Sequence, residues 1–285
     1  MRGDGTVAGE KRSEEKRGED AERYLVPGLQ RGLEILRCFR RDRPHVSAAE
    51  VAKELRIPRS TVFRLMTTLE YLGFLERSRD GRDYRLGVAV LSLGFEYLAS
   101  LEITELARPL LERLRDETGF NAHLVVRDGR EVVFVMKVAA PSTFVGSVSI
   151  GTRMPAHATV LGRAFLAHMD GGELEALYPQ RTLERFTPQT PATLDDLRVL
   201  LAEDRHRGYA ISESFFERGI SAIAAPVFDD TGTVTAVINI TVPEGSADPE
   251  RLRGPLAERV VATARELSRR LDYDETRGRR LAANF

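Results

Sequence analysis

The stretch from Ser47 to Leu72 constrains the fold most, because its pattern predicts two short helices joined by a tight turn. Ser47 can cap the first helix, and Glu50, three residues on, can complete a capping box. Pro58 is tolerated in the first turn of a helix but not in its middle, so it marks the start of the second helix. Gly73 then ends that helix. The stretch therefore predicts a helix-turn-helix.

The second of these helices has an apolar face and a polar face. Its inward residues, at helical spacing, are Val62, Leu65, Met66 and Leu69. The residues left exposed over its first two turns, which we expect to face the major groove of DNA, are Arg59, Ser60, Thr61 and Arg64. Helical hairpins of ordinary enzymes show similar patterns, so this stretch does not establish DNA binding by itself.

The next segment, FLERSRDGRDYRLG, predicts a β-hairpin that turns at Asp80-Gly81, as in the wing of a winged helix domain. The arginines that we expect to meet phosphates are Arg77, Arg79, Arg82 and Arg85. Residues 56–85 hold seven arginines against four acidic residues, whereas the whole chain has a net charge of -1. Basicity confined to one small module predicts a double-stranded DNA operator as partner, because phosphate neutralisation supplies most non-specific affinity.

A chain of 285 residues with 42% apolar residues is long enough for two domains. We expect a disordered tail over residues 1–23, a winged helix-turn-helix domain over 24–87, a connecting helix over 88–101, a larger domain over 102–273 and a flexible tail over 274–285. The connecting segment VAVLSLGFEYLA is apolar nearly all round. We therefore expect it to pair with the same helix of a second subunit; the alternative is that it packs into the larger domain.

The larger domain alternates between runs typical of helices and of strands. The expected strands are residues 121–128, 131–138, 147–155, 220–228 and 233–242, and the expected helices are residues 103–117, 158–169, 172–177, 194–207 and 249–273. Strands grouped on either side of helices predict an α+β fold with a mostly antiparallel sheet.

Several classes of protein are disfavoured by what the sequence lacks. No apolar run approaches the roughly 18 to 20 residues of a membrane helix, and the N-terminus has no apolar signal segment, so a cytoplasmic protein is expected. The single cysteine, Cys38, and the scattered histidines predict neither a disulfide framework nor a metal site, and no cofactor is expected. No nucleophile motif or phosphate loop is visible, which argues against an enzyme.

Several motifs together resemble the IclR family of bacterial transcriptional regulators: PRSTVFRLMTTLEYLGFL, the wing, GTRMPAHATVLGRAFLA, GYAISE and GISAIAAPVFDDTGTVTAVINIT. The resemblance covers about Val26 to Leu271. It implies an N-terminal winged helix-turn-helix and a C-terminal GAF-like α/β effector-binding domain. It also implies homodimers that often pair into tetramers, and repression or activation of catabolic genes under the control of a small organic ligand.

The resemblance also implies a set of effector contacts. In members that bind small carboxylates, the ligand lies against the backbone just beyond the HAT segment, which here means Val160 and Leu161. Free backbone N–H groups at a helix start attract a carboxylate, and an amide and a hydroxyl two apart on one strand point the same way. The further contacts implied are Ser212, Ala222, Asn239 and Thr241.

This sequence departs from the family pattern towards an apolar pocket. Val160 and Leu161 replace small residues that are common after HAT, and Phe215 replaces an acidic residue. Phe134, Met136 and Phe215 are expected to add apolar wall. We therefore expect an aromatic or other larger carboxylate rather than a two-carbon acid.

Two other functions stay open at this point. One is an enzyme that carries a winged domain for targeting, and the other is a ligand-independent architectural DNA binder. Turnover of a substrate would identify the first, and operator affinity indifferent to every metabolite would identify the second.

Overall fold

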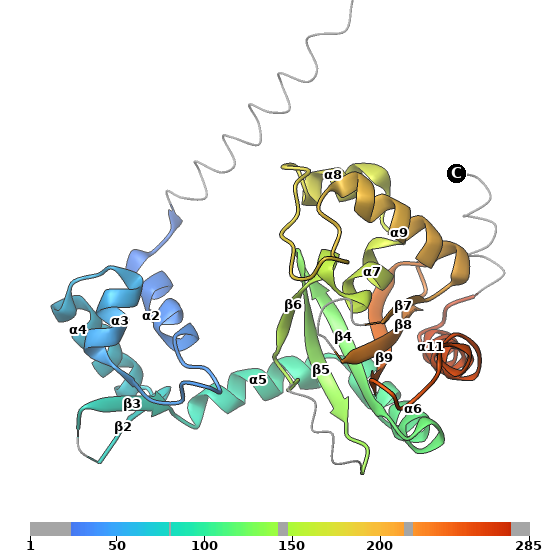
Figure 1. Cartoon of the computed structure of the whole chain (residues 1–285). Coiled ribbons are helices and arrows are strands. Elements are labelled where there is room, and N and C mark those ends of the chain that lie inside the picture. Colours follow the sequence, from blue (N-terminus) through green and yellow to red (C-terminus); the bar gives the residue numbers. More distant parts are fainter. Residues whose placement is uncertain (1–23, 80, 142–147, 214–218, 275–285) are drawn as a thin grey trace, which may run out of the picture. The chain divides into compact units, whose positions relative to one another are not determined.

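The computed structural model describes residues 24–79, 81–141, 148–213 and 219–274 (Figure 1). The chain divides into two compact units, residues 1–97 and 98–285. The two predicted tails, apart from residue 274, lie outside the described residues, as do Asp80 of the predicted wing turn and Phe215 of the predicted pocket. The domain boundaries proposed above stay predictions.

The N-terminal unit is a winged helix-turn-helix, as the sequence predicts. Its elements are α2 (Pro27–Arg37), β1 (Val46–Ser47), α3 (Ala48–Leu55), α4 (Arg59–Tyr71), β2 (Leu75–Arg77) and β3 (Asp83–Leu86). The strands form an antiparallel sheet in the order β1-β3-β2. Ser47 caps α3, and both halves of the capping box with Glu50 are formed. Gly73 has a φ of +78°, so the chain turns out of α4 at a residue without a side chain.

The core of this unit lies between its three helices and the sheet. Val62 and Met66 of α4 are fully buried there against Ile35 of α2 and Val51 of α3. Cys38 belongs to the same cluster, and burial raises the pKa of its thiol, which suits a packing role. Because the apolar face of α4 packs against this core, its opposite face is available to solvent or to a partner.

Helix α5 (Ala89–Ser100) spans the division between the two units. None of its residues is buried, although most are apolar. The large apolar side chains exposed on or beside it are Val88, Leu91, Leu93, Phe95 and Tyr97. Such a run of exposed apolar side chains on one helix is uncommon on the surface of a single chain.

The C-terminal unit is built on a six-stranded sheet whose strand pairs are all antiparallel, in the order β6-β5-β4-β9-β8-β7. The strands are β4 (Asn121–Asp128), β5 (Glu131–Val138), β6 (Arg153–Pro155), β7 (Ala210–Glu213), β8 (Ile220–Phe228) and β9 (Val234–Pro243). The prediction of a mostly antiparallel sheet is confirmed. The strand expected over residues 147–155 is limited, among its described residues, to β6.

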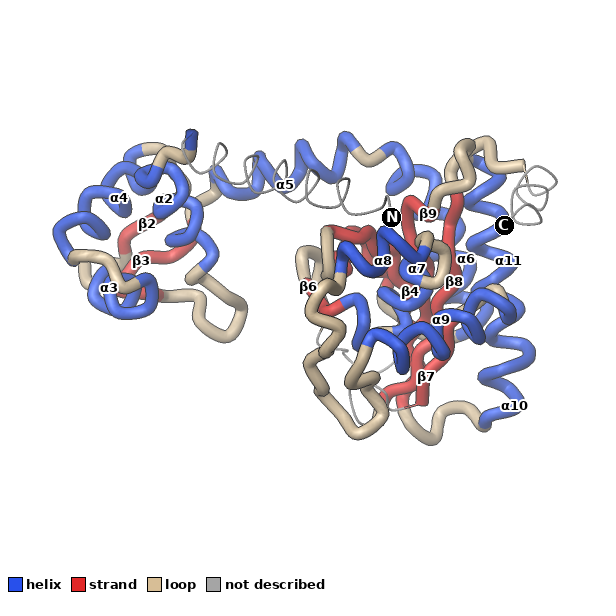
Figure 2. The backbone as a smooth tube through the Cα atoms, turned by 90° about the horizontal axis from the view of Figure 1, so that it is seen from above, coloured by secondary structure: helices blue, strands red, loops and turns tan. Residues whose placement is uncertain are grey.

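Helices cover both faces of this sheet (Figure 2). One face packs against α6 (Glu102–Thr118) and α11 (Ala257–Arg270), and the other against α7 (Val160–Leu166) and α9 (Leu194–Arg207). The remaining elements are a short 3-10 turn (Ala156–Ala158), α8 (Gly171–Leu177), α10 (Pro249–Arg251) and a π-turn (Leu252–Leu256). The single helix expected over residues 249–273 is interrupted at this π-turn, which contains Gly254 and Pro255, because proline removes a helical hydrogen bond.

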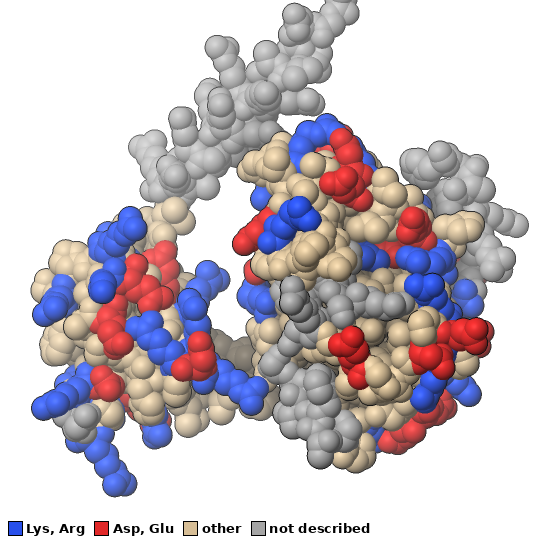
Figure 3. All heavy atoms as spheres, viewed as in Figure 1, with Lys and Arg blue, Asp and Glu red and all other residues tan. Residues whose placement is uncertain are grey.

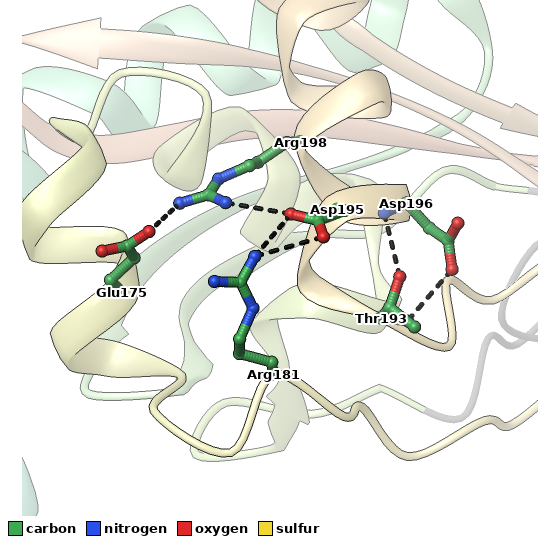
Figure 4. Close-up of polar contacts among 6 residues, drawn as sticks. All are labelled: Glu175, Arg181, Thr193, Asp195, Asp196 and Arg198. Atoms are coloured by element: carbon green, nitrogen blue, oxygen red, sulfur yellow. Dashed lines mark hydrogen bonds and ion pairs between the residues drawn. The ribbon is translucent and has the colours of Figure 1, made fainter.

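A surface network fixes the start of α9 against α8 (Figure 4). Thr193 caps α9 and accepts from the N–H of Asp196, whose carboxylate accepts from the N–H of Thr193. The guanidinium of Arg198 donates both to Asp195 and to Glu175 of α8, at 3.0 and 2.6 Å. Exposed ion pairs of this kind contribute little to the stability of the unit.

A buried ion pair connects three elements of the C-terminal unit. Arg163 of α7 donates to both carboxylate oxygens of Asp204 of α9, at 2.7 and 3.0 Å, and both side chains are almost wholly buried. The same guanidinium donates to the carbonyl oxygen of Ile211 in β7, at 3.1 Å. This bidentate contact locks α7, and with it the backbone just after the HAT segment, in one position on the sheet.

Candidate functional site

The predicted base-reading residues lie together at the start of α4. Arg59, Ser60 and Arg64 are exposed, and Thr61 is half-buried. The sequence argument missed Phe63, which lies on the same exposed side with 52% of its surface accessible. Its spacing from Arg59, four residues earlier, places the two on one helix face and was the signal available. The face therefore combines positive charge with an aromatic ring.

The four wing arginines differ in what they contact. Arg77 donates to Glu70 of α4, at 3.0 and 3.3 Å, and its guanidinium lies over the ring of Tyr84. Arg85 donates to Glu76 at 2.6 Å, within the wing. Arg77 therefore fastens the wing to the end of α4, so a phosphate contact from it would require exchange of partners.

Arg79 and Arg82 are exposed on either side of the wing turn. Figure 3 shows basic side chains spread over the visible face of the N-terminal unit, with acidic side chains among them. The base of the wing is held by a close approach of backbone, because a Cβ on Gly87 would lie 2.2 Å from the carbonyl oxygen of Gly73. Only glycine fits there, and the wing is thereby held at a fixed position beside α4.

The C-terminal unit contains a cavity on the face of its sheet that carries α7. It is lined by residues of all six strands, by the start of α7 and by Val148 of the loop before β6. The lining residues are Asn121, His123, Phe134, Val148, Met154, Thr159, Val160, Leu161, Ser212, Ile220, Ala222, Asn239 and Thr241. The cavity volume is about 80 Å³. This is several times the roughly 10 to 15 Å³ that a single water needs, so a compact organic molecule can fit.

The HAT segment shapes one wall of this cavity. Thr159 caps α7, and its hydroxyl accepts from the N–H of Gly162 at 3.2 Å. A Cβ on Gly162 would lie 2.1 Å from Cα of Ala156, so the absence of a side chain lets the preceding turn pack directly on the helix. This packing sets Val160 and Leu161 against the sheet.

Two polar side chains form the most buried part of the lining. His123 of β4 and Asn239 of β9 are cross-strand partners, and each is only 2% exposed. Burial lowers the pKa of His123 to about 4, nearby Lys137 lowers it too, and Asn239 acts in the opposite direction. His123 is therefore neutral at neutral pH. The effect of Asn239 is that of a side-chain hydrogen bond to His123, and within the described part of the chain neither His123 Nδ1 nor Asn239 Oδ1 has a further hydrogen-bond partner.

Most of the predicted effector residues lie together in this cavity. They are Val160, Leu161, Ser212, Ala222, Asn239, Thr241 and Phe134. Met136 is the exception, because it lies on the opposite face of the sheet in the core against α6 and α11. Phe215 falls outside the described residues.

The misplacement of Met136 has a local cause. Val125 of β4 pairs with Phe134 while Leu124 pairs with Met136, so β5 holds one extra residue, Val135, at this point. A bulge of this kind shifts the alternation of side chains by one position, which turns Met136 away from Phe134's face.

Sequence reasoning also missed several lining residues: Asn121, His123, Val148, Met154, Thr159 and Ile220. His157, two residues before Thr159, does not belong to the lining and instead hydrogen-bonds through Nε2 to the carbonyl oxygen of Glu184 at 2.9 Å. The alternation along NAHLVVRD places Asn121 and His123 on one strand face, and this was the signal that could have found them.

In the described ranges, no three or more His, Cys, Asp or Glu side chains gather closely enough to hold a metal ion. No helix described there combines the length and apolarity needed to cross a membrane.

A winged helix-turn-helix unit followed by a separate unit with its own pocket defines a DNA-binding transcriptional regulator. Residues 95–269 match the family described as bacterial transcriptional regulator IclR C-terminal, and residues 28–79 match the IclR helix-turn-helix domain. The chain belongs to the IclR family of transcriptional regulators.

Its relatives support the same conclusion. The HTH-type transcriptional regulator XynR of Escherichia coli strain K12 is 29% identical over 249 residues, which cover 87% of this chain and 98% of that protein. The Pca regulon regulatory protein of Pseudomonas putida is 29% identical over 248 residues, covering 87% and 84%. The prediction of a regulator rather than an enzyme is confirmed by these names.

One similar solved structure contains a bound ligand. The crystal structure of an IclR homologue from Microbacterium hydrocarbonoxydans, complexed with 4-hydroxybenzoate, superposes with a TM-score of 0.75. It is 26% identical and covers 86% of this chain and 99% of that one.

Proposed function

We propose that this regulator controls a catabolic operon and that a small organic acid, aromatic in character, binds in the cavity and changes its affinity for operator DNA. The observation that carries the proposal is a largely apolar cavity that has the buried polar side chains of His123 and Asn239 in its lining. A pocket with an apolar lining and a few fixed polar groups is typical of a binding site for a small organic molecule. We place this activity in the cytoplasm, where the operator lies.

The apolar lining supports an aromatic acid over a two-carbon acid. Phe134, Met154 and Leu161 offer flat or flexible apolar surface, and pockets of this composition bind ligands chiefly by burying apolar area. A relative that binds 4-hydroxybenzoate favours the same ligand class. We propose that the ligand's acid group contacts the backbone N–H groups of Val160 and Leu161 at the start of α7.

We propose that α4 reads base edges with Arg59, Ser60, Thr61 and Arg64, and that Phe63 adds an apolar contact to a thymine methyl group. Arg79 and Arg82 of the wing contact phosphates directly. Arg77 and Arg85 contribute to the same positive surface while paired with Glu70 and Glu76.

The exposed apolar residues of α5 support a homodimer. A second copy of the same helix would cover Leu91, Phe95 and their neighbours, which are more than half exposed in the single chain. Two-fold pairing then presents two reading helices to a pseudo-palindromic operator. Dimers of this kind can associate further into tetramers.

The cavity also separates this proposal from a ligand-independent architectural binder, which needs no pocket of this kind. Occupancy would favour one of two arrangements of the reading helices, and operator affinity would follow that population shift. The sign of the effect, repression or activation, depends on which arrangement fits the operator.

The test is a gel-shift titration of the full chain on its own promoter fragment, with excess competitor DNA and with each of a panel of aromatic and aliphatic carboxylates. The proposal predicts a specific complex whose apparent Kd changes with at least one acid and is unchanged by the others. Binding without site preference, or a Kd that no acid changes, would contradict it.

A further inference from the structure

The C-terminal unit contains a second cavity, separate from the one beside the HAT segment. We call it the α11 cavity, because it is lined by residues of α11 and β8, by the end of α9, by His168 just after α7 and by Tyr273. Its volume is about 300 Å³, and the two cavities share no lining residue. This volume lies at the lower end of the roughly 300 to 1,000 Å³ that is typical of small-molecule sites.

The α11 cavity lies where β7 stops short of the end of β8. Among the described strands, β7 pairs with β8 over residues 221–224 only, so residues 225–228 have no strand on that side. Pro226 has no N–H group, and the N–H of Phe228 donates to the hydroxyl of Ser268 in α11 at 2.9 Å. The edge of the sheet therefore offers this cavity side chains and no free N–H at these two positions.

One wall of the α11 cavity is aromatic. The rings of Phe228 and Tyr273 are stacked, with centroids 4.9 Å apart and an angle of 20° between their planes. The ring of His168 meets Phe228 edge-on, at 5.0 Å and 89°. Burial, followed by the charge of Arg205, lowers the pKa of His168 to about 4, so this ring is neutral at neutral pH. A flat apolar ring can join such a group by stacking or by edge-on contact.

The charged groups of the α11 cavity are both positive. Arg205 lies in the last turn of α9 and Arg265 lies on α11, and none of the described residues that line the cavity is acidic. An adjoining depression shares Arg265 and Tyr273 and adds Arg269 and Asp274. The positive charge around the cavity therefore exceeds the negative charge, and planar guanidinium groups match the geometry of a carboxylate.

We propose that the α11 cavity is a second ligand site of this chain and that it binds a small aromatic acid. The ring of the ligand contacts the aromatic wall formed by His168, Phe228 and Tyr273. Its acid group faces the guanidinium groups of Arg205 and Arg265. This proposal goes beyond the effector function of the first cavity and does not depend on it, because different residues form the two sites.

The experiment is equilibrium dialysis of the full chain with benzoate as the probe. In the double variant Arg205→Gln, Arg265→Gln, amides replace both guanidinium groups of the α11 cavity. We expect the wild-type chain to bind benzoate at one site more than the double variant, because affinity at this site falls at least about tenfold without the charged hydrogen bonds. Both arginines are exposed, so the variant should fold, which circular dichroism checks.

The matched control is Arg269→Gln, which removes the same charge from the same helix but does not line the α11 cavity. It should keep the site. An equal number of benzoate sites in the wild type and the double variant would overturn the proposal, and so would loss of the site in Arg269→Gln.

Two further probes test the aromatic wall. Cyclohexanecarboxylate carries the same charge without a flat ring, and inorganic phosphate carries charge alone. Both should bind the α11 cavity at least about threefold more weakly than benzoate, and Tyr273→Leu should abolish the preference for benzoate over cyclohexanecarboxylate. Equal affinities of the wild-type chain for the three probes would contradict an aromatic acid as the ligand.

A last variant separates the two cavities. Ala222→Phe occupies space in the cavity beside the HAT segment, so it should weaken any binding there and leave the α11 site unchanged. Loss of the arginine-dependent site in this variant would place the ligand in the first cavity and overturn the proposal. Because the arginine variants leave that cavity intact, failure of the α11 site would not affect the proposed effector function.

Discussion

The two units use their polar side chains in opposite ways. The N-terminal unit keeps Arg59 and Arg64 in solvent on an exposed helix face, whereas the C-terminal unit buries Asn239 and His123 inside a cavity. DNA offers dense charge over a long surface, so many solvated cations suffice to bind it. A small ligand offers few contacts, so each must be desolvated and fixed in advance to discriminate. We therefore expect substitutions in the two units to have different signatures.

The largest effect should come from the buried ion pair of the C-terminal unit. Asp204→Ala leaves Arg163 buried without its bidentate partner, and we expect a loss of about 3 to 5 kcal/mol in the free energy of unfolding. Urea denaturation followed by circular dichroism measures it. The matched control is Asp195→Ala on the same helix, whose carboxylate is exposed; its effect on stability should be small. Equal losses in the free energy of unfolding for the two variants would show that burial does not determine how much each carboxylate contributes to stability.

Acid should weaken the C-terminal unit through its buried histidines. Burial lowers the pKa of both His123 and His168 to about 4, below the ordinary value near 6.5 in the unfolded chain. As pH falls below 6.5, the unfolded chain binds protons first, so stability present above pH 6.5 is lost as pH falls towards 4. The loss is up to about 3 kcal/mol for each histidine.

Denaturation midpoints between pH 7 and pH 4 measure this slope. In His168→Gln the free energy of unfolding should change less steeply with pH in that window, by the equivalent of about one proton taken up on unfolding, because one of the two titrating groups is removed. A stability that is flat across the window in the unmodified chain would contradict the neutral, buried state of both rings.

In the N-terminal unit the expected effects concern binding rather than stability. Arg64→Ala should weaken specific operator binding by about 1 to 3 kcal/mol and non-specific binding far less, because a base contact is lost. Arg82→Ala should weaken both similarly and lower the salt slope by about one unit. Fluorescence anisotropy over a range of salt concentrations distinguishes them, and equal losses for the two variants on both kinds of DNA would contradict their separate roles.

Phe63 should give the smallest effect. Phe63→Ala removes an exposed ring, so the free energy of unfolding should barely change while operator affinity falls by about 1 kcal/mol. Replacing operator thymines one at a time by deoxyuridine removes the methyl group that the ring would contact. One such replacement should weaken binding of the unmodified chain and leave the Phe63→Ala variant unaffected. If the loss of affinity from Phe63→Ala and the loss from deoxyuridine add up at every thymine, Phe63 does not contact a thymine methyl group.

The same contrast explains what the sequence could predict. The winged unit is encoded by local signals: Ser47 and Glu50 form their capping box within one helical turn, and Pro58 and Gly73 bound α4. Such signals act over a few residues and do not depend on the rest of the fold.

The pocket depends on long-range register instead. Asn239 was predicted from the family resemblance, but its partner His123 enters the cavity only because β4 pairs with β9 in one register. Met136 was placed on the wrong face because the extra residue Val135 in β5 cannot be seen as a bulge from the pattern of one strand. Strand alternation predicts faces correctly only between such irregularities.

The central claim is that ligand occupancy of the C-terminal cavity and operator binding by the N-terminal unit are coupled. Calorimetry can measure the Kd of the strongest-binding acid twice, for the full chain alone and for the chain saturated with its operator fragment. Linkage requires the two values to differ by the same factor by which the acid changes operator affinity, and we expect a factor of at least about five. Identical values in the two titrations would contradict the account.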